Sequence, residues 1–381
     1  MLSWPVTAGR RGFPLWSTGF GEEGCYQSVA TAPECDGRRW SDPPRTQGAV
    51  RASRIIAPEE GARVIVVLAG GVGAARFLRG LTAVAEGHDV TVIANVGDDI
   101  DVHGLRICPD LDSIAYWLSG LVHPNQQWGR ADERFTVREE LARFGHQSWF
   151  TLGDRDLATH LHRSALLAQD VPLSDVTRGI AEHLGLEVRL LPVSDDRIET
   201  RIHTTDGRDL HFQEWWVRDR AVPDVRNVEF SGVETATPAP GVLEAMMTAD
   251  AVIIAPSNPV VSIWPIIEVP GVRDALTRTS ARVIGISPIV GGRVVRGMAH
   301  RLLPAVGCGV DAAEVAFWYG SRDAGGLLDG WVLDTADAAS IDRVNALGID
   351  AVATDTMLDD PVVAARLATT VLDLSGSLST R

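Results

Sequence analysis

A run of β-branched and aliphatic residues that ends abruptly in closely spaced glycines constrains this chain more than any other feature. The run VIVVLA over 64–69 has the composition of a buried strand, and Gly70, Gly71 and Gly73 follow it. The amphipathic stretch that comes next predicts a helix over 74–86. Glycine lets the backbone approach a ligand closely, and the free N–H groups at a helix start favour anions, phosphates above all. We therefore expect a phosphorylated ligand at this turn.

The glycine turn begins a βαβ unit whose second strand is expected at 90–95. A right-handed crossover would make the two strands parallel. The second strand runs into the sequence NVGDD, so Asp98 and Asp99 follow its carboxyl end. Asp110 and Asp112 then open a helix that is expected to run to about residue 119, and an N-terminal cap explains one of these carboxylates but does not need both. Open α/β sheets bind ligands at the carboxyl edge, where these side chains are expected.

The rest of the chain continues an α/β pattern. Residues 120–186 are expected to be mostly helical, and residues 1–60, which lack any sustained period, are expected to be a disordered N-terminal extension or the product of a start codon upstream of the true one. A hairpin is expected where 199–204 and 210–213 flank an Asp-Gly turn. Further strands are expected at 187–192, 251–255, 282–286, 330–333 and 350–353, and helices at 134–145, 155–169, 174–184, 311–319, 337–346 and 360–373.

Composition narrows how the turn could hold phosphate. All 35 basic residues are arginine, because the chain contains no lysine. A Walker-A lysine, a Schiff-base lysine and a kinase-type strand lysine are therefore excluded. A net charge of −15 argues against a general nucleic-acid binder, and no apolar run of about 18 residues predicts a transmembrane helix. The four cysteines form no C-x-x-C pair, which favours a reduced, cytoplasmic setting.

The turn differs at its last position from the Gly-x-Gly-x-x-Gly fingerprint of dinucleotide-binding folds. Arg76 stands where that fingerprint has its third glycine, and a long basic side chain there would crowd a nicotinamide-binding fold but suits a phosphate. Two alternatives stay open at this point. One is a nicotinamide-dependent oxidoreductase that uses the turn with Asp98 or Asp99. The other is a nucleotide-binding regulatory protein without catalytic activity.

Several carboxylates near a phosphate indicate a hard cation, most of all Mg²⁺, that bridges protein and diphosphate oxygens. Asp98, Asp110 and Asp112 are the candidate ligands, although any one of them could be a cap or a solvated loop residue. Arg155, between Asp154 and another carboxylate, is either a phosphate clamp or part of a structural ion pair.

Two further pairs could contact a substrate. Trp215 and Trp216 could stack on a planar ring or pack in the core. Ser257 and Asn258 follow the strand at 251–255, where they could contact a nucleobase or a phosphate, or form an Asx-capped turn.

Taken together and in order, the motifs resemble the CofD-like family, the 2-phospho-L-lactate and phosphoenolpyruvate transferases of coenzyme F420 biosynthesis. The resemblance spans about 64–373, essentially all of the chain but the N-terminal extension. The matching segments are AGGVGAAR (69–76), NVGDD (95–99), PDLD (109–112), LGDRD (152–156), PVSDD (192–196), FQEWW (212–216), PSNP (256–259), SPI (287–289) and TDTM (354–357).

The resemblance implies an α/β fold with a Rossmann-like, doubly wound, mostly parallel sheet and an inserted, mostly helical region, within a domain over 61–381. It also implies a homodimer, Mg²⁺ as cofactor, and transfer of a phosphorylated three-carbon acid from its guanosine diphosphate conjugate to the deazaflavin Fo, with release of GMP. Many members have a second glycine or a Thr-Pro-Lys run where this chain has Ala74, Ala75 and Arg76. The arginine form resembles the actinobacterial-type branch, which favours phosphoenolpyruvate over phospholactate. Some relatives also have a basic residue, an Fo contact, where this chain has Thr151.

The residues and the resemblance together give a hypothesis for the site. Arg76 and Arg155 would offset phosphate charge, and Asp112 would orient or deprotonate the attacking Fo hydroxyl. A metal ion would be held by some of Asp98, Asp110 and Asp112. The predicted substrate contacts are Gly70, Gly71, Gly73 and Asp154, with Trp215 or Trp216 on the deazaflavin and Ser257 and Asn258 on the guanine.

Overall fold

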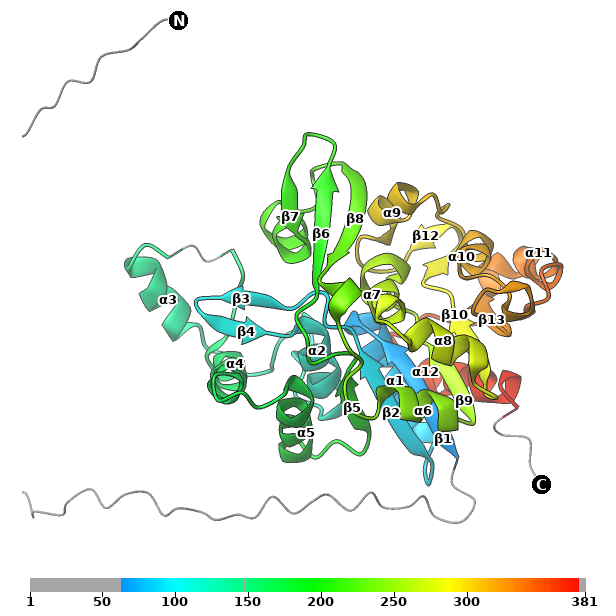
Figure 1. The fold of residues 1–381 in the computed structure, drawn as a ribbon, viewed down its shortest axis with the longest axis horizontal. Coiled ribbons are helices and arrows are strands. Elements are labelled where there is room, and N and C mark those ends of the chain that lie inside the picture. The colour runs from blue at the N-terminus through cyan, green and yellow to red at the C-terminus, as the bar shows by residue number, and fades with distance from the viewer. Residues whose placement is uncertain (1–62, 147–148, 377–381) are drawn as a thin grey trace, which may run out of the picture. The chain divides into compact units, whose positions relative to one another are not determined.

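Seven strands, all paired in parallel, form the central sheet of the computed structural model, which describes residues 63–146 and 149–376. Their order is β14-β13-β10-β9-β1-β2-β5 (Figure 1). The extension expected over 1–60 lies outside the described residues. The strands are β1 (Val64–Ala69), β2 (Asp89–Ala94), β5 (Arg189–Pro192), β9 (Ala251–Ile254), β10 (Arg282–Ile286), β13 (Gly330–Asp334) and β14 (Asp350–Thr354).

The chain fills this sheet outward from β1 in two directions. β2 and then β5 follow on one side of β1, whereas β9, β10, β13 and β14 follow on the other side. The direction reverses between β1 and β9, where Leu68 faces Ile93 on one edge and Ile254 on the other. This is the topology of a doubly wound sheet, so the expectation of a Rossmann-like, mostly parallel α/β fold is confirmed.

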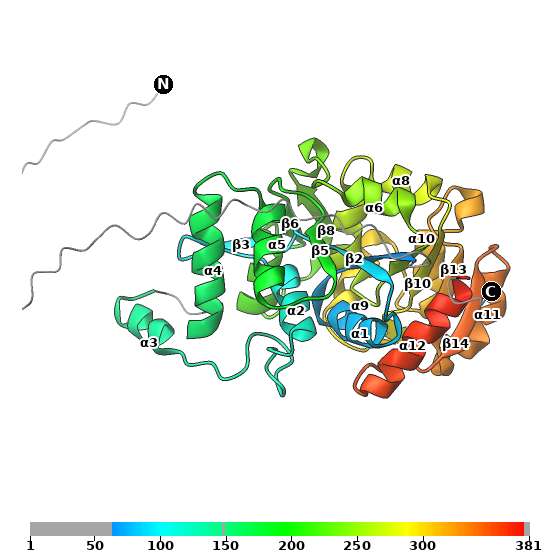
Figure 2. The same cartoon turned by 90° about the horizontal axis from the view of Figure 1, so that it is seen from below.

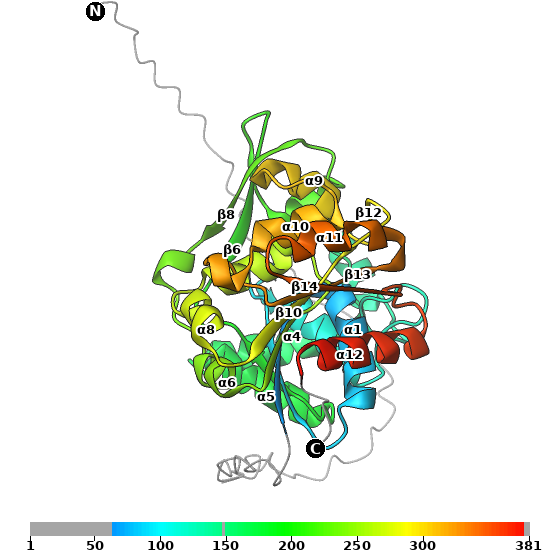
Figure 3. The ribbon, with the colours of Figure 1, turned by 90° about the vertical axis from the view of Figure 1, so that its right-hand side faces the viewer.

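Helices cover both faces of the sheet. α1 (Gly71–Val84) and α12 (Pro361–Leu374) lie on one face, and α6 (Val242–Thr248) and α8 (Val272–Arg278) lie on the other (Figures 2 and 3). Strands that are covered on both faces consist of nearly continuous runs of apolar residues, as these strands do. The remaining helices are α2 (Pro109–Leu118), α3 (Thr136–Arg143), α4 (Asp154–Leu167), α5 (Leu173–His183), α7 (Trp264–Glu268), α9 (Ala299–Leu302), α10 (Ala312–Tyr319) and α11 (Ile341–Asn345).

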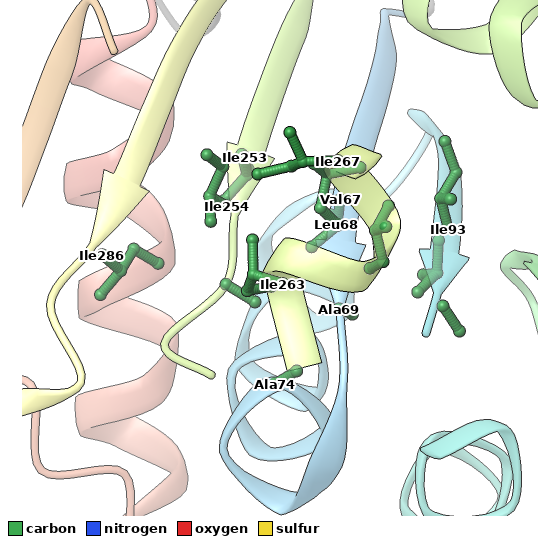
Figure 4. Close-up of a cluster of buried hydrophobic side chains, with 14 of the residues drawn as sticks. Val67, Leu68, Ala69, Ala74, Ile93, Ile253, Ile254, Ile263, Ile267 and Ile286 are labelled. Carbon is green, nitrogen blue, oxygen red and sulfur yellow. The ribbon is translucent and has the colours of Figure 1, made fainter. Parts of the chain in front are cut away.

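The core lies between these layers and continues to the edge where the site forms. Figure 4 shows Val67 and Leu68 of β1 beside Ile253 and Ile254 of β9, with Ile263 over the end of the strands. All of these side chains are buried. Because the residues next to the glycine turn are part of the core, the backbone of the turn is held in place by packing on both sides.

Small antiparallel elements lie outside the central sheet. The expected hairpin is present as β6 (Glu199–Thr204) and β7 (Asp209–His211), but an unexpected third strand, β8 (Val225–Ser231), pairs with the other edge of β6. β3 (Ile100–Val102) and β4 (Leu105–Ile107) form another hairpin, and β11 (Ile289–Val290) pairs with β12 (Arg293–Val294). Strands of two or three residues are too short to produce a recognisable alternation in the sequence.

Several helix bounds differ from the expected ones. α1 begins at Gly71 rather than at residue 74, so Gly71 and Gly73 belong to its first turn. The stretch expected as a helix over 337–346 is a 3-10 helix at Thr335–Ser340 followed by the short α11. The short helices α6 to α9 were not expected, because four to seven residues do not span two turns of a periodic pattern. Among residues 63–146 and 149–376, no helix is both long enough and apolar enough to cross a membrane.

The contact between α1 and α12 gives a stability prediction. A Cβ on Gly80 would lie 2.3 Å from the backbone carbonyl carbon of Ala364, so Gly80→Ala should lower the free energy of unfolding by about 1–3 kcal/mol. Urea denaturation measures this change. Gly179→Ala in α5 is the matched control, because a Cβ there meets no atom within 4 Å and should raise stability by up to about 1 kcal/mol. Equal effects of the two substitutions would contradict the packing argument.

Candidate functional site

A cavity of about 630 Å³ lies at the carboxyl edge of the sheet, next to the point where the strand order reverses. Segments that follow β1, β2, β9, β10 and β14 all contribute to its wall, as expected for a ligand crevice in a doubly wound sheet. Most of the residues predicted from the sequence line this cavity. They are Gly70, Gly71, Gly73, Arg76, Asp98, Asp110, Asp112, Trp216, Ser257 and Asn258.

The glycine turn presents backbone to the cavity. Gly71 has a φ of 69°, in the left-handed region that favours glycine. A Cβ on Gly73 would lie 2.4 Å from the carbonyl oxygen of Pro256, so a glycine is needed for α1 to begin this close to the end of β9. The first N–H groups of α1 have no partner within the helix, and the residues that carry them line the cavity. This part of the wall therefore suits an anion.

Ser257 and Asn258 lie against this turn from the side of β9. Gly70 N–H donates to Ser257 Oγ at 3.4 Å. Asn258 Oδ1 accepts the N–H of Val260 at 3.0 Å and that of Val261 at 3.5 Å. The oxygen of Asn258 therefore caps the following turn, and its NH₂ group remains as the donor that could contact a ligand in the cavity.

Two carboxylates are buried close together beside the turn. Asn95 Nδ2 donates to Asp110 Oδ2 at 2.9 Å, and Asn95 Oδ1 accepts the N–H of Gly97 at 2.8 Å. Burial raises the pKa of Asp110 to about 6, although hydrogen bonds from Asn95 and the Gly71 backbone oppose the shift. Burial and then the charge of Asp110 raise the pKa of Asp98 well above its usual range. Two anions held this close, away from water, favour a cation between them.

These carboxylates fit a divalent cation such as Mg²⁺. Asp98 Oδ1 is buried and has no hydrogen-bond partner in the described part of the chain. No group of three or more His, Cys, Asp or Glu side chains in that part converges into a complete metal cage. Mg²⁺ is commonly held by one or two carboxylates together with water and substrate phosphates. A cation at Asp98 and Asp110 would thus take its other ligands from water and a phosphorylated substrate.

Asp112 lines the cavity but is held differently from the other two carboxylates. Arg163 Nη1 donates to Asp112 Oδ2 at 3.1 Å, and Arg163 Nη2 bonds the other oxygen, Oδ1. Both residues are buried. Because this two-pronged ion pair engages both oxygens of Asp112, the geometry favours Asp98 and Asp110 over Asp112 as metal ligands.

A chain of ionisable groups extends from this ion pair along α4. His160 Nδ1 lies 3.7 Å from Asp112 Oδ2, and its Nε2 lies 3.3 Å from Asp156 Oδ1. Tyr116 O–H donates to Asp156 Oδ1 at 2.7 Å. Each of these four residues lines the cavity. The Tyr116 hydrogen bond and the close approach of His160 to both carboxylates therefore link the polar groups of this wall.

Aromatic side chains form another part of the wall. Trp216 is partly exposed there, with its ring 5.4 Å from that of Phe212. Trp128, Trp149 and Phe150 line the same cavity. Such a surface suits a planar ring, since aromatic faces stack on one another.

Three of the predicted site residues lie away from the cavity wall. Trp215 is fully buried and its Nε1 donates to the Pro223 carbonyl at 2.9 Å, so it belongs to the core and not to a substrate surface. The Arg155 side chain is about half exposed, its nearest carboxylate being Asp132 at 4.0 Å. Asp154 accepts the N–H groups at the start of α3, which is a capping role. We correct the predictions for these three residues accordingly.

Other residues of the site were not predicted as site residues from the sequence: Asp156, His160 and Arg296 line the cavity, whereas Arg163 and Asn95 bond carboxylates that line it. Asp156, His160 and Arg163 are spaced by four and three residues, which places them on one face of α4 and was a usable signal. Asn95 was noted only as the first residue of the motif NVGDD (95–99), without a role in the site. Arg296 carried no local signal, because it reaches the cavity from a loop far along the chain.

The sequence of this chain is similar to those of known enzymes. Residues 65–371 match the family described as 2-phospho-L-lactate transferase CofD. The chain is 50% identical over 315 residues to a protein named phosphoenolpyruvate transferase from Streptomyces griseus subsp. griseus, covering 82% of this chain and 98% of the relative. It is 46% identical over 327 residues to the protein of the same name from Mycolicibacterium smegmatis, covering 82% and 98%.

Solved structures support the fold independently of these sequences. The crystal structure of a UPF0052 family member from Bacillus halodurans has a TM-score of 0.56 at 18% identity. The likeness covers 82% of this chain and 99% of that chain. At such low identity it concerns the fold alone.

The buried ion pair at Asp112 predicts a large loss of stability when it is broken. Asp112→Asn leaves the Arg163 guanidinium buried without its carboxylate and should lower the free energy of unfolding by about 3–5 kcal/mol. Arg178→Gln is the control, because Arg178 pairs with Asp175 on the exposed surface of α5 and should matter by at most about 0.5 kcal/mol. Chemical denaturation compares the two variants. A small effect in both would contradict the role given to the buried pair.

Proposed function

The chain belongs to the 2-phospho-L-lactate transferase CofD family, and on that premise we propose that it transfers a phosphoenolpyruvate moiety, or a 2-phospholactate moiety, to the terminal hydroxyl of the deazaflavin Fo. The donor is the guanosine diphosphate conjugate of the three-carbon acid, and GMP leaves. The observation that carries the proposal is the buried pair Asp98 and Asp110 beside the start of α1. That arrangement suits a diphosphate with a bound cation.

The donor diphosphate would lie over the glycine turn, where the first N–H groups of α1 would donate hydrogen bonds to its oxygens. Asp98 and Asp110 would hold Mg²⁺, which when bound neutralises phosphate charge and polarises the reacting phosphorus. Ser257 and the NH₂ group of Asn258 lie on the β9 side of the same turn and are the proposed contacts of the nucleotide.

The acceptor Fo would enter with its planar ring on the aromatic part of the wall. Trp216 is the proposed stacking residue, since Trp215 is in the core. The Fo hydroxyl attacks the phosphorus that carries the three-carbon acid, the phosphorus–oxygen bond to GMP breaks, and the hydroxyl proton is lost to solvent. Arg163 engages both oxygens of Asp112, so we assign Asp112 the role of orienting the hydroxyl rather than removing its proton. Phosphoryl transfer needs little more than such positioning and charge stabilisation.

The two alternative functions have less support. Arg76 occupies the position of the third fingerprint glycine, and its guanidinium stacks on the Trp117 ring with 5.6 Å to the centroid, an arrangement unlike a nicotinamide site. The similar proteins named above carry a transferase name, which favours catalysis over a purely regulatory role. A homodimer and a cytoplasmic location stay predictions.

The proposed reaction is tested directly by its products. Fo, Mg²⁺ and either guanosine conjugate should yield the Fo phosphodiester and GMP, identified by mass spectrometry. Asp98→Asn and Asp110→Asn should each lower kcat by about 10²-fold or more. Asp89→Asn is the matched control, because Asp89 is exposed at the opposite, amino end of β2. Absence of product with both donors would end the proposal, and full activity in both site variants would end the metal assignment.

The Mg²⁺ requirement should depend on pH. A carboxylate must lose its proton to bind a metal, and burial raises the pKa of Asp110 to about 6. At limiting Mg²⁺ the rate should therefore fall as the pH drops through about 6, and the raised pKa of Asp98 acts in the same direction. More Mg²⁺ should move the midpoint to lower pH, because the cation competes with the proton. Initial rates between about pH 5 and pH 8 at two Mg²⁺ concentrations measure this, and a midpoint indifferent to Mg²⁺ would contradict the role of Asp110.

A further inference from the structure

Two arginines from distant parts of the chain reach the same side-chain oxygen at the edge of the cavity. Arg76 of α1 and Arg296 of the loop after β12 both hydrogen-bond Gln127 Oε1, and both arginines line the cavity. Burial and then the charge of Arg76 lower the pKa of Arg296, which means that the two cations repel each other. The neutral amide oxygen does not balance two positive charges and Asp359 offsets only one of them, so this arrangement favours an added anion.

The amide between the two arginines is itself held in place. The Trp117 Nε1 donates to the backbone carbonyl of Gln127 at 3.2 Å, and the Trp117 ring lies under the Arg76 guanidinium. Gln127 has a φ of 63°, a left-handed conformation that is unfavourable for a residue with a Cβ. Strain of this kind persists where the surrounding contacts impose it, and it is frequent at ligand sites. Arg76, Trp117, Gln127 and Arg296 thus form a preorganised cluster, named here the arginine pair site.

Charge balance indicates what the arginine pair site can bind. Arg76 Nη2 pairs with Asp359 Oδ1 at 2.9 Å, and the Asp359 side chain is 68% exposed. Arg296 makes no ion pair with a carboxylate within residues 63–146 and 149–376, and the buried Nε of Arg76 has no hydrogen-bond partner there. Two cations and one anion leave a single positive charge. The site therefore matches a group with one negative charge better than a diphosphate.

The arginine pair site is separate from the anion site at the start of α1. Arg76 follows Gly71 by five residues, so its Cα lies about 7.5 Å further along the helix axis. Helical side chains lean back toward the N-terminus, which brings the guanidinium alongside the glycine turn rather than in front of it. An anion between Arg76 and Arg296 would accordingly lie next to a diphosphate bound at the turn and would not replace it.

We propose that Arg76 and Arg296 bind the carboxylate of the transferred three-carbon acid. This inference rests on the proposed function, because the guanosine conjugate carries one carboxylate besides its diphosphate. Guanidinium groups bind a carboxylate with paired, directed hydrogen bonds, and two of them can grip both oxygens. The arginine pair site then selects for an acid at this position. It does not separate enolpyruvate from lactate, since both donors carry the same carboxylate.

The experiment compares the lactate conjugate of guanosine diphosphate with its carboxamide analogue, in which the carboxylate is replaced by a neutral group. Calorimetry with Mg²⁺ gives the Kd of each compound, and of GDP, for the wild-type chain, Arg296→Gln, Arg296→Lys and Arg293→Gln. The wild type should bind the acid about 10-fold or more tightly than the amide. Arg296→Gln should reduce that ratio to less than about 3-fold with the GDP affinity unchanged. Arg296→Lys should fall between, because lysine keeps the charge without the planar fork.

Arg293→Gln is the matched control, because Arg293 lies in β12, three residues before Arg296, and is exposed as Arg296 is but does not line the cavity; it should behave as the wild type. An acid-to-amide ratio near one in the wild type, or one unchanged in Arg296→Gln, would overturn the inference. A parallel loss of GDP affinity in Arg296→Gln would also overturn it, since the arginine would then bind phosphate. Fo added to the wild-type complex tests the proposed function separately: absence of the phosphodiester would refute that function, whereas the binding ratios report on Arg296 alone.

Discussion

The repulsion between Asp98 and Asp110, buried together at the carboxyl edge of the sheet, is the constraint on which the rest of the site depends. Burial raises the pKa of both carboxylates, so keeping them ionised requires compensating groups nearby. The Asn95 amide and the backbone at the start of α1 supply part of that compensation. The fold supplies these groups because the sheet reverses its order between β1 and β9, which leaves a crevice where the ends of β1, β2 and β9 meet.

Asp112, on the same first turn of α2 as Asp110, meets the same need for charge compensation in another way. Asp112 is neutralised within the protein by Arg163, and His160 links this pair to Asp156. A carboxylate that is already paired is rigid, whereas one with an unpartnered buried oxygen, such as Asp98, is available to a ligand. The same cavity thus contains Asp112, whose position is fixed by its ion pair with Arg163, and Asp98, whose free oxygen suits a cation. This division is consistent with phosphoryl transfer, in which preorganised charge does most of the work.

Much of the fold could be predicted, because its signals are local. The run over 64–69, the glycines after it and the carboxylates after β2 lie within about forty residues, and each pattern covers a whole strand or helix start. The short helices α6 to α9 and the three-residue strands of the β3–β4 hairpin gave no such pattern, since they are too short for one period to repeat. The helix start at Gly71 also differs from the predicted one, because a glycine-rich segment has the composition of a turn and not of a helix.

The sequence by itself determined the α/β class, the glycine-rich turn between the first strand and helix, the absence of any lysine chemistry and the set of carboxylates near the site. Only the tertiary structure decided which of these residues share one cavity. Trp215 and Trp216 are neighbours in the chain, yet one is in the core and the other lines the cavity. Arg155 and Arg163 both belong to α4, yet Arg155 is half exposed and Arg163 is buried against Asp112. Arg76 and Arg296 are separated by more than two hundred residues and meet at Gln127. The physical reason is that charge pairing and burial act through space, and sequence patterns report only on neighbours along one strand or helix.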